Sequence, residues 1–185
     1  MTKKQLLNEL DNVSGLRENR IRVANLVLQN TTCLPKLLDI SFDMANKMSV
    51  KAIWILEFIA KTNITLIFPF VDFLSKNMQL ITKDSAVRSL AKILQLLVEE
   101  NKNSEFLTVK QKDRFIEIAF DWMISTHKVA IKAYSMRSLF YLGKNSDWVH
   151  DELSTIIKEN MHHESAAYKS RGRITLEQIN KLANQ

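Results

Sequence analysis

Glycine and proline are scarce in this chain, and their scarcity restricts the folds that it can adopt. Only three glycines and two prolines occur among 185 residues. Folds built from many strands need turn residues, and nucleotide-binding folds need a glycine-rich loop that holds phosphate. Hydrophobic residues make up 46% of the chain, which is enough for a packed core. We therefore expect residues 1–185 to form one folded domain.

Apolar residues recur with the spacing of an α-helix along almost the entire chain. No segment alternates convincingly with the two-residue period of a strand, and the β-branched run at 64–68 has no partner strand. The class is therefore all-α. The expected helices lie near residues 2–13, 16–29, 32–46, 49–62, 65–79, 83–100, 109–125, 127–143, 147–162 and 165–182.

Signals for the ends of helices accompany this periodicity. Ser14, Ser49, Thr82 and Ser146 each stand before an expected helix, where a hydroxyl can accept a free backbone N–H. Gly143 stands where the eighth helix should stop.

The helices are expected to form an internal repeat of antiparallel pairs. Four second helices share a basic residue followed by a small one: Lys51-Ala52, Arg88-Ser89, Lys132-Ala133 and Lys169-Ser170. The spacings are 37, 44 and 37 residues, and the extra seven fall at 99–105, which is expected to be a longer loop. Pro35 and Pro69 stand 34 residues apart in two first helices. The five expected pairs lie near 2–29, 32–62, 65–100, 109–143 and 147–182.

The stretch Asp84-Ser85-Ala86-Val87-Arg88-Ser89-Leu90-Ala91 resembles the second-helix signature of HEAT repeats. Val50-Lys51 and Ile131-Lys132 are similar with lysine in place of arginine, and Arg22 is the possible equivalent in the first pair. The first-helix prolines also resemble that family. The resemblance to the HEAT/armadillo-like superfamily implies an α-α superhelix, a solenoid with a concave groove.

Two further stretches, residues 23–30 and 54–58, resemble short bacterial chains that are labelled adenylosuccinate lyase. The residues do not support that label. The true lyase is more than twice as long and has a mobile loop rich in serine and glycine, whereas Gly15, Gly143 and Gly172 are isolated here.

The repeated basic residues Lys51, Arg88, Lys132 and Lys169, which we call the basic ladder, should line one face of a helical repeat. In HEAT-like arrays, which this chain resembles, such a basic residue often has a structural role and pairs with an acid four residues earlier, as Asp84 precedes Arg88 here. The equivalent positions elsewhere are Lys47, Lys128 and Ser165. In a helix, Lys47/Lys51 and Lys128/Lys132 would repel each other.

Two interpretations of the basic ladder therefore stay open. One is a structural or solvated face, with carboxylates such as Glu57 or Asp121 neutralising it through space. The other is an anion-binding stripe, whose candidate residues are Lys47, Lys51, Arg88, Lys128, Lys132, Lys169 and Trp54. Trp54 aligns with Ala91, Ser135 and Gly172, so it either fills a gap in the core or projects into the groove.

Catalytic chemistry has no clear candidate. His162 and His163 are adjacent, so in a helix they point about 100° apart and do not suit one metal ion. Cys33 stands alone and suits a small buried role. We expect no metal, no cofactor and no enzymatic activity.

Charge and targeting signals suggest the class of partner and the compartment. The net charge is +6, and residues 107–146 hold seven basic and three acidic residues. This excess is modest for a dedicated DNA-binding domain. One cysteine, no signal peptide and no membrane segment predict a cytoplasmic chain, and we expect a monomer.

These observations favour a non-enzymatic scaffold that binds a protein with an acidic surface in its concave groove. The alternative is nucleic-acid binding through phosphates, with a possible relation to HEAT-like DNA alkylation-repair glycosylases. A remote alternative is an enzyme, including the labelled lyase.

Overall fold

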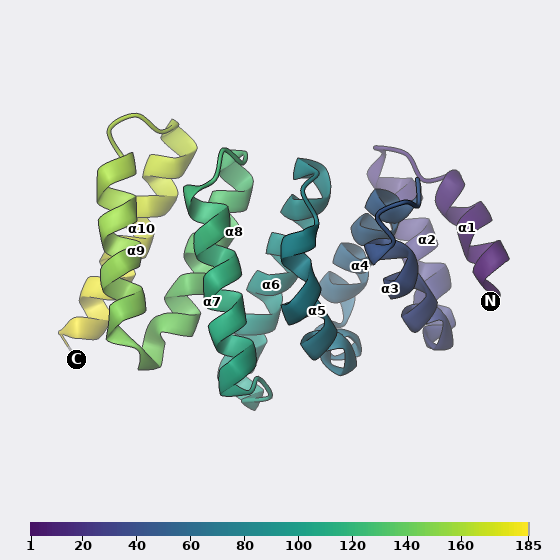
Figure 1. The fold of residues 1–185 in the computed structure, drawn as a ribbon, viewed down its shortest axis with the longest axis horizontal. Helices are drawn as coiled ribbons and strands as arrows, with labels where there is room; N and C mark the ends of the chain where they lie inside the picture. Colours follow the sequence, from purple (N-terminus) through teal and green to yellow (C-terminus); the bar gives the residue numbers. More distant parts are fainter. Residues whose placement is uncertain (185) are drawn as a thin grey trace. The chain divides into compact units, whose positions relative to one another are not determined.

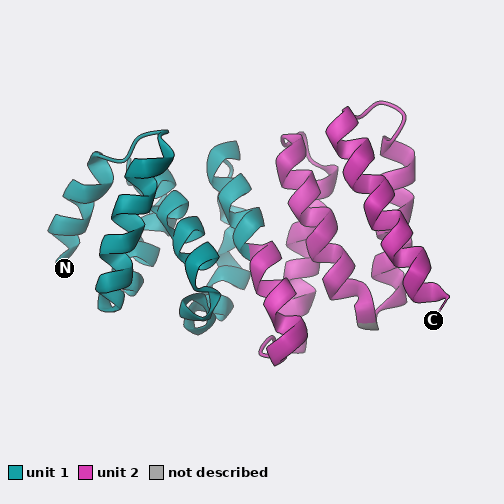
Figure 2. Cartoon of the chain, turned by 180° about the vertical axis from the view of Figure 1, so that it is seen from behind, with its two compact units in different colours: residues 1–93 teal, residues 94–185 magenta. Residues whose placement is uncertain are grey.

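The computed structural model describes residues 1–184, and over that range the chain forms α-helices and short 3-10 helices without strands. The predicted all-α class is confirmed. Ten α-helices follow one another along the described chain (Figure 1). They fall into two compact units, Met1–Ile93 (unit 1) and Leu94–Gln185 (unit 2), which are coloured separately in Figure 2.

Unit 1 is organised around α4 (Ser49–Thr62), which packs against α2 (Arg17–Gln29) and α3 (Leu34–Phe42). Helix α4 is apolar on most faces, because isoleucine, leucine and alanine recur through it, and seven of its residues are buried. The other elements of unit 1 are α1 (Lys3–Asp11), α5 (Val71–Asn77), the first part of α6 (Asp84–Ser104), and the 3-10 helices Thr31–Cys33, Ile64–Phe70 and Met78–Leu80.

Unit 2 is organised around α8 (Val129–Leu142), which packs against α7 (Val109–Ile124), α9 (Asp147–Asn160) and α10 (Ala166–Ala183). The buried side chains of α8 are mainly apolar, although Ser135 and Ser138 are also buried. The remaining elements are the second part of α6 and the 3-10 helix Gly143–Asn145.

The predicted helix 65–79 is wrong in its details. A 3-10 helix, Ile64–Phe70, comes first, and α5 is only seven residues long. Pro69 lies inside the 3-10 segment and has no N–H to donate, so it disfavours a continuous α-helix. The predicted helix 32–46 is also too long, because α3 ends at Phe42.

The predicted loop at 99–105 is also wrong. Helix α6 continues to Ser104 through a polar segment whose glutamate and lysine residues are good helix formers. The helix ends at Ser104, and the next residue, Glu105, has a φ of 44°, a left-handed conformation that does not continue an α-helix. The Asn101 side chain then accepts the N–H of Leu107 at 2.7 Å.

The predicted helix ends are met in different ways. Leu16, not Ser14, is the N-cap residue of α2, and the Ser14 hydroxyl accepts the Leu16 N–H at 3.2 Å. Gly143 is the C-cap of α8 as predicted. Glycine is needed here for steric reasons, because an added Cβ would lie 2.5 Å from the ring of His150. That ring bonds the Phe140 carbonyl at 2.9 Å and thereby satisfies an end carbonyl of α8.

Candidate functional site

The basic ladder has structural partners within unit 1. Lys51 Nζ donates to the backbone carbonyl of Asp11 at 2.7 Å. Arg88 donates to Glu57 Oε2 at 3.0 Å, so its partner comes from α4, 31 residues away in sequence. The through-space neutralisation expected of Glu57 is therefore present at Arg88.

In unit 2, Lys132 donates to Glu164 Oε1 at 2.5 Å, and the two side chains are only 13% and 18% exposed. The hydrogen bond from Lys132 is the main cause that lowers the pKa of Glu164 below its usual range. Lys169 is half-buried, and its side chain makes no ion pair with any residue that the structure describes.

The two lysines that precede the ladder residues lie outside helices. Lys47 stands in the turn before α4, and Lys128 is the extended N-cap residue of α8. The helical i, i+4 spacing on which the expected repulsion depended is therefore absent from Lys47/Lys51 and from Lys128/Lys132. Both Lys47 and Lys128 are exposed.

Trp54 is half-buried on α4 and is held on two sides. Its indole N–H donates to the Ser85 carbonyl at 3.3 Å. The guanidinium carbon of Arg20 lies 4.0 Å from the ring centre, which is the geometry of a cation–π contact. Trp54 thus anchors an arginine of α2 in position.

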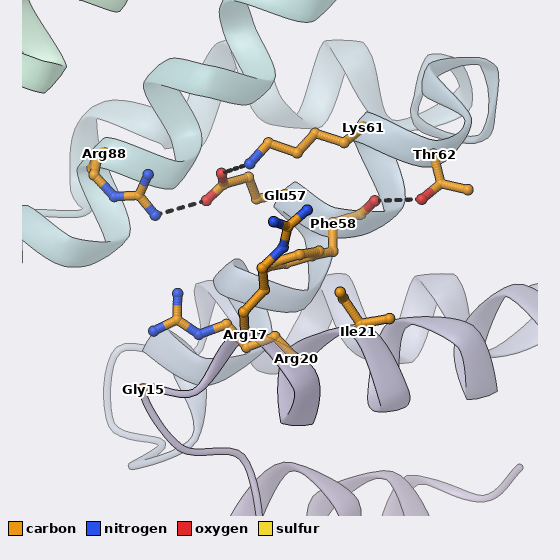
Figure 3. A pocket seen from close by; sticks show the side chains of 9 residues that line it. All are labelled: Gly15, Arg17, Arg20, Ile21, Glu57, Phe58, Lys61, Thr62 and Arg88. Atoms are coloured by element: carbon orange, nitrogen blue, oxygen red, sulfur yellow. Dashed lines mark hydrogen bonds and ion pairs between the residues drawn. The ribbon is translucent and has the colours of Figure 1, made fainter.

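Next to this stack is a pocket of about 610 Å³, which we call the basic pocket. All of it belongs to unit 1. Its lining residues come from α2 and the turn before it, from α4 and from α6, and are labelled in Figure 3: Gly15, Arg17, Arg20, Ile21, Glu57, Phe58, Lys61, Thr62 and Arg88.

Glu57 is the only carboxylate in this lining, and its side chain is just 1% exposed. One oxygen accepts from Lys61, and the other accepts from Arg88 at 3.0 Å and from the Ser89 hydroxyl at 2.5 Å. Figure 3 shows the carboxylate between Lys61 and Arg88. A buried carboxylate needs such partners, because moving a charged group out of water is costly. Glu57 is therefore fully occupied by internal donors.

Two further cations line the basic pocket without a carboxylate of their own. Arg17 is exposed, and its side chain makes no ion pair with the residues that the structure describes. Arg20 donates through Nε to the Ser14 carbonyl at 3.3 Å. Burial and the charge of Arg88 lower the pKa of Arg20, and Glu57 only partly opposes them. Four cations against one carboxylate leave three positive charges in excess.

A second pocket of about 490 Å³ lies within unit 2 and differs in charge. Three lysines in its lining face two acids, Glu105 and Asp113. Trp148 lies at its edge, 57% exposed, and stacks on Phe120 with ring centres 6.0 Å apart. This pocket is close to neutral, so the basic pocket is the better candidate for an anion.

Among the described residues, the histidines and the cysteine have side chains that can bind a metal or act as a nucleophile. No group of three or more metal-ligating side chains occurs in the part of the chain that the structure describes. Burial raises the pKa of the Cys33 thiol, and the thiol donates to the Asn30 carbonyl at 2.7 Å. His162 and His163 are exposed near the end of α9.

Sequence reasoning found Arg88 but missed three other cations of the basic pocket. Arg17 and Arg20 lie in the first helix pair, where the repeat signature is weakest. Their spacing of three residues places them on one face of a helix, which is the signal that could have found them. Lys61 follows Glu57 by four residues, and this helical spacing predicts the ion pair between them.

The fold and the pocket define a class: an all-α protein with a positively charged pocket lined by residues of three helices. The particular family follows from comparison with known sequences. A family model described as a HEAT repeat domain matches residues 7–179, and the chain belongs to that family. The resemblance to HEAT repeats is thereby confirmed. The comparisons found no match among curated proteins or among solved structures.

The family gives the coarse function. HEAT repeats form helical scaffolds that are generally non-enzymatic and that typically mediate protein interactions. Within the described residues, no helix combines the length and apolar character needed to span a membrane.

Proposed function

We propose that this protein is a non-enzymatic HEAT-repeat scaffold that binds an acidic segment of a partner protein, with the basic pocket of unit 1 as the principal contact. One observation carries the proposal. Arg17, Arg20, Lys61 and Arg88 converge on a pocket whose single carboxylate is buried and already bonded, so their charge is only partly neutralised.

The geometry supports attraction of an anion at this place. Burial lowers the pKa of Arg20, and the charge of Arg88 lowers it further, so the two guanidinium groups oppose each other. An acidic group entering the pocket relieves that repulsion. The interaction is stronger in a concave pocket than on an open surface, because the surrounding protein excludes part of the screening water.

The proposal assigns a secondary role to the ladder residues and their neighbours. Lys47 and Lys51 in unit 1, and Lys128, Lys132 and Lys169 in unit 2, would extend the attraction for an acidic chain within each unit, while Trp54 holds Arg20 at the basic pocket. Lys47 and Lys128 are exposed and thus accessible to a partner, whereas Lys132 is tied to Glu164. The proposed form is a cytoplasmic monomer without a cofactor, and size-exclusion chromatography with light scattering checks the monomer.

The test uses a fluorescein-labelled peptide of ten glutamates as a defined acidic probe, with binding followed by fluorescence anisotropy at low salt. Arg17→Glu removes one cation and adds an acid, and it touches no structural partner. We expect at least a tenfold loss of affinity. Lys4→Glu makes the same change on an exposed residue of α1 and should have a much smaller effect.

Absence of binding by the wild-type protein, or an equal loss in both variants, would contradict the proposal. Affinity should also fall as salt rises, since exposed charges are screened. A DNA duplex serves as the competing ligand for the nucleic-acid alternative. Tighter binding of duplex than of peptide at equal salt, with a steep salt slope, would favour that alternative instead.

A further inference from the structure

We propose that the basic pocket selects a phosphate monoester over a carboxylate, so that the acidic segment of the partner is recognised through a phosphorylated side chain. This inference rests on the proposed function and specifies its ligand. It follows from the charge, the donors and the shape of the same pocket.

The charge of the pocket exceeds what a carboxylate neutralises. Four cations and one internal carboxylate leave an excess of three, whereas a carboxylate ligand carries one negative charge. A phosphate monoester carries about −1.5 to −2 near neutral pH and offers three acceptor oxygens. It therefore relieves more of the repulsion between Arg20 and Arg88, which adds to the effect of burial in lowering the pKa of Arg20.

The donors are arranged for an anion with several oxygens. Arg17 and Arg20 come from α2 and Arg88 comes from α6, so the guanidinium groups approach the pocket from two helices. Each guanidinium has five N–H donors in a planar fork, which suits phosphate oxygens. Arg20 uses Nε for Ser14, and Arg88 uses one terminal nitrogen for Glu57, so each keeps further donors.

Glu57 does not compete for this space. Its side chain is 1% exposed, and both of its oxygens already accept hydrogen bonds. Its role is to hold Lys61 and Arg88 in fixed positions at the pocket. A preorganised set of cations binds an anion with a smaller loss of side-chain freedom.

The shape of the pocket favours a phosphate carried on a side chain. Its volume of about 610 Å³ is larger than one phosphate group needs, and Ile21 and Phe58 provide an apolar wall beside the cations. A phosphate at the end of a side chain can enter such a pocket while its carbon atoms contact this wall. Phosphates of a nucleic-acid duplex are spread along a broad helix and are not presented singly in this way.

The experiment compares phenyl phosphate with benzoate, which share a ring and differ in the anion, and includes inorganic phosphate. Binding is followed in ¹⁵N-labelled protein through the indole N–H of Trp54, because Arg20 stacks on that ring. The three tryptophan signals are assigned with single Trp→Phe variants. We expect phenyl phosphate to bind at least tenfold more tightly than benzoate at equal ionic strength.

Two variants separate the site from general charge. Arg17→Gln should weaken phenyl phosphate binding at least fivefold, and Lys4→Gln should leave it unchanged. The affinity for phenyl phosphate should rise between pH 5 and pH 7, as the second phosphate proton, with a pKa of about 6, is lost. Binding of benzoate should not show this rise.

Equal affinity for benzoate, or no rise with pH, would overturn phosphate selection while glutamate-peptide binding still upholds the proposed function. Failure of the glutamate peptide and of all small anions would overturn both. Equal affinity for inorganic phosphate and phenyl phosphate would identify free phosphate as the ligand and overturn recognition of a phosphorylated side chain.

Discussion

Both units place an acid beside a basic residue of the ladder, but the balance of charge around the two acids differs. In unit 1, the single carboxylate of Glu57 serves both Lys61 and Arg88, while Arg17 and Arg20 line the same pocket. The acid is buried and the cations surround it. The result is a pocket with an excess of positive charge.

In unit 2, each of two basic residues has an acid of its own. Lys132 pairs with Glu164, and Arg137 pairs with Glu99. Both acids lie outside residues 107–146, the segment with the largest basic excess in sequence. The comparison teaches that a charged segment is not a charged surface. Ion pairs neutralise part of the positive excess in unit 2. In unit 1, more of the positive charge around the basic pocket has no acidic partner.

The largest effect is expected when the buried acid of unit 1 is removed. Glu57→Gln leaves Arg88 and Lys61 without their counter-charge and should lower the free energy of unfolding by about 3 kcal/mol. Chemical denaturation measures the change. Glu18→Gln is the control, because Glu18 is exposed on α2. If Glu57→Gln costs no more than this control, the Glu57 carboxylate does not stabilise the fold by balancing the charges of Lys61 and Arg88.

Close packing in unit 2 gives the next largest effect. Gly172 aligns with Trp54 of unit 1, and an added Cβ would lie 2.8 Å from Cγ2 of the fully buried Ile157. Gly172→Ala should destabilise the protein by about 2 kcal/mol, because overpacking outweighs the gain in helix propensity. Gly15→Ala meets nothing within 4 Å and should be neutral in thermal unfolding. Equal melting temperatures for the two variants would show that α9 and α10 can separate at this contact.

The ion pair between Lys132 and Glu164 in unit 2 should contribute least to stability. Glu164→Gln is expected to lower stability by about 1 kcal/mol at pH 7, since the glutamine oxygen can still accept the hydrogen bond from Lys132. Its lowered pKa means that its contribution is present above the unfolded value of about 4.5 and is lost as pH falls through the folded pKa. Denaturation curves of the wild type and the variant should therefore converge below pH 4.5. A difference that does not shrink as pH falls below 4.5 would show that the ion pair is not its source.

The repeat architecture was readable from the sequence because it depends on local periodicity. The fourth helix was predicted at its observed bounds, since Ser49–Thr62 contains neither proline nor glycine. The segment around Pro69 was not, because the loss of one N–H changes the type of helix rather than ending it. The loop at 99–105 was misplaced because the alignment of repeats does not say which residues of an insertion remain helical.

The candidate site was less accessible to sequence reasoning. The expected partner of Arg88 was four residues earlier, but Glu57, 31 residues away, accepts its hydrogen bond. The sequence suggests Glu57 only as one of several carboxylates that neutralise the basic ladder through space. Contacts between helices depend on packing, which a short motif does not encode. Arg17 and Arg20 were missed because they belong to the first pair, where the motif is degenerate.

The internal carboxylate of the basic pocket also bears on how selection acts on this protein. A surface that attracts anions is usually open to gradual change, because exposed lysines can be exchanged one at a time. Here Lys61 and Arg88 support the core through Glu57 and also line the pocket. A substitution that changes ligand preference at either position therefore changes stability as well. Altered specificity should arise first at Arg17, which has no structural role of this kind.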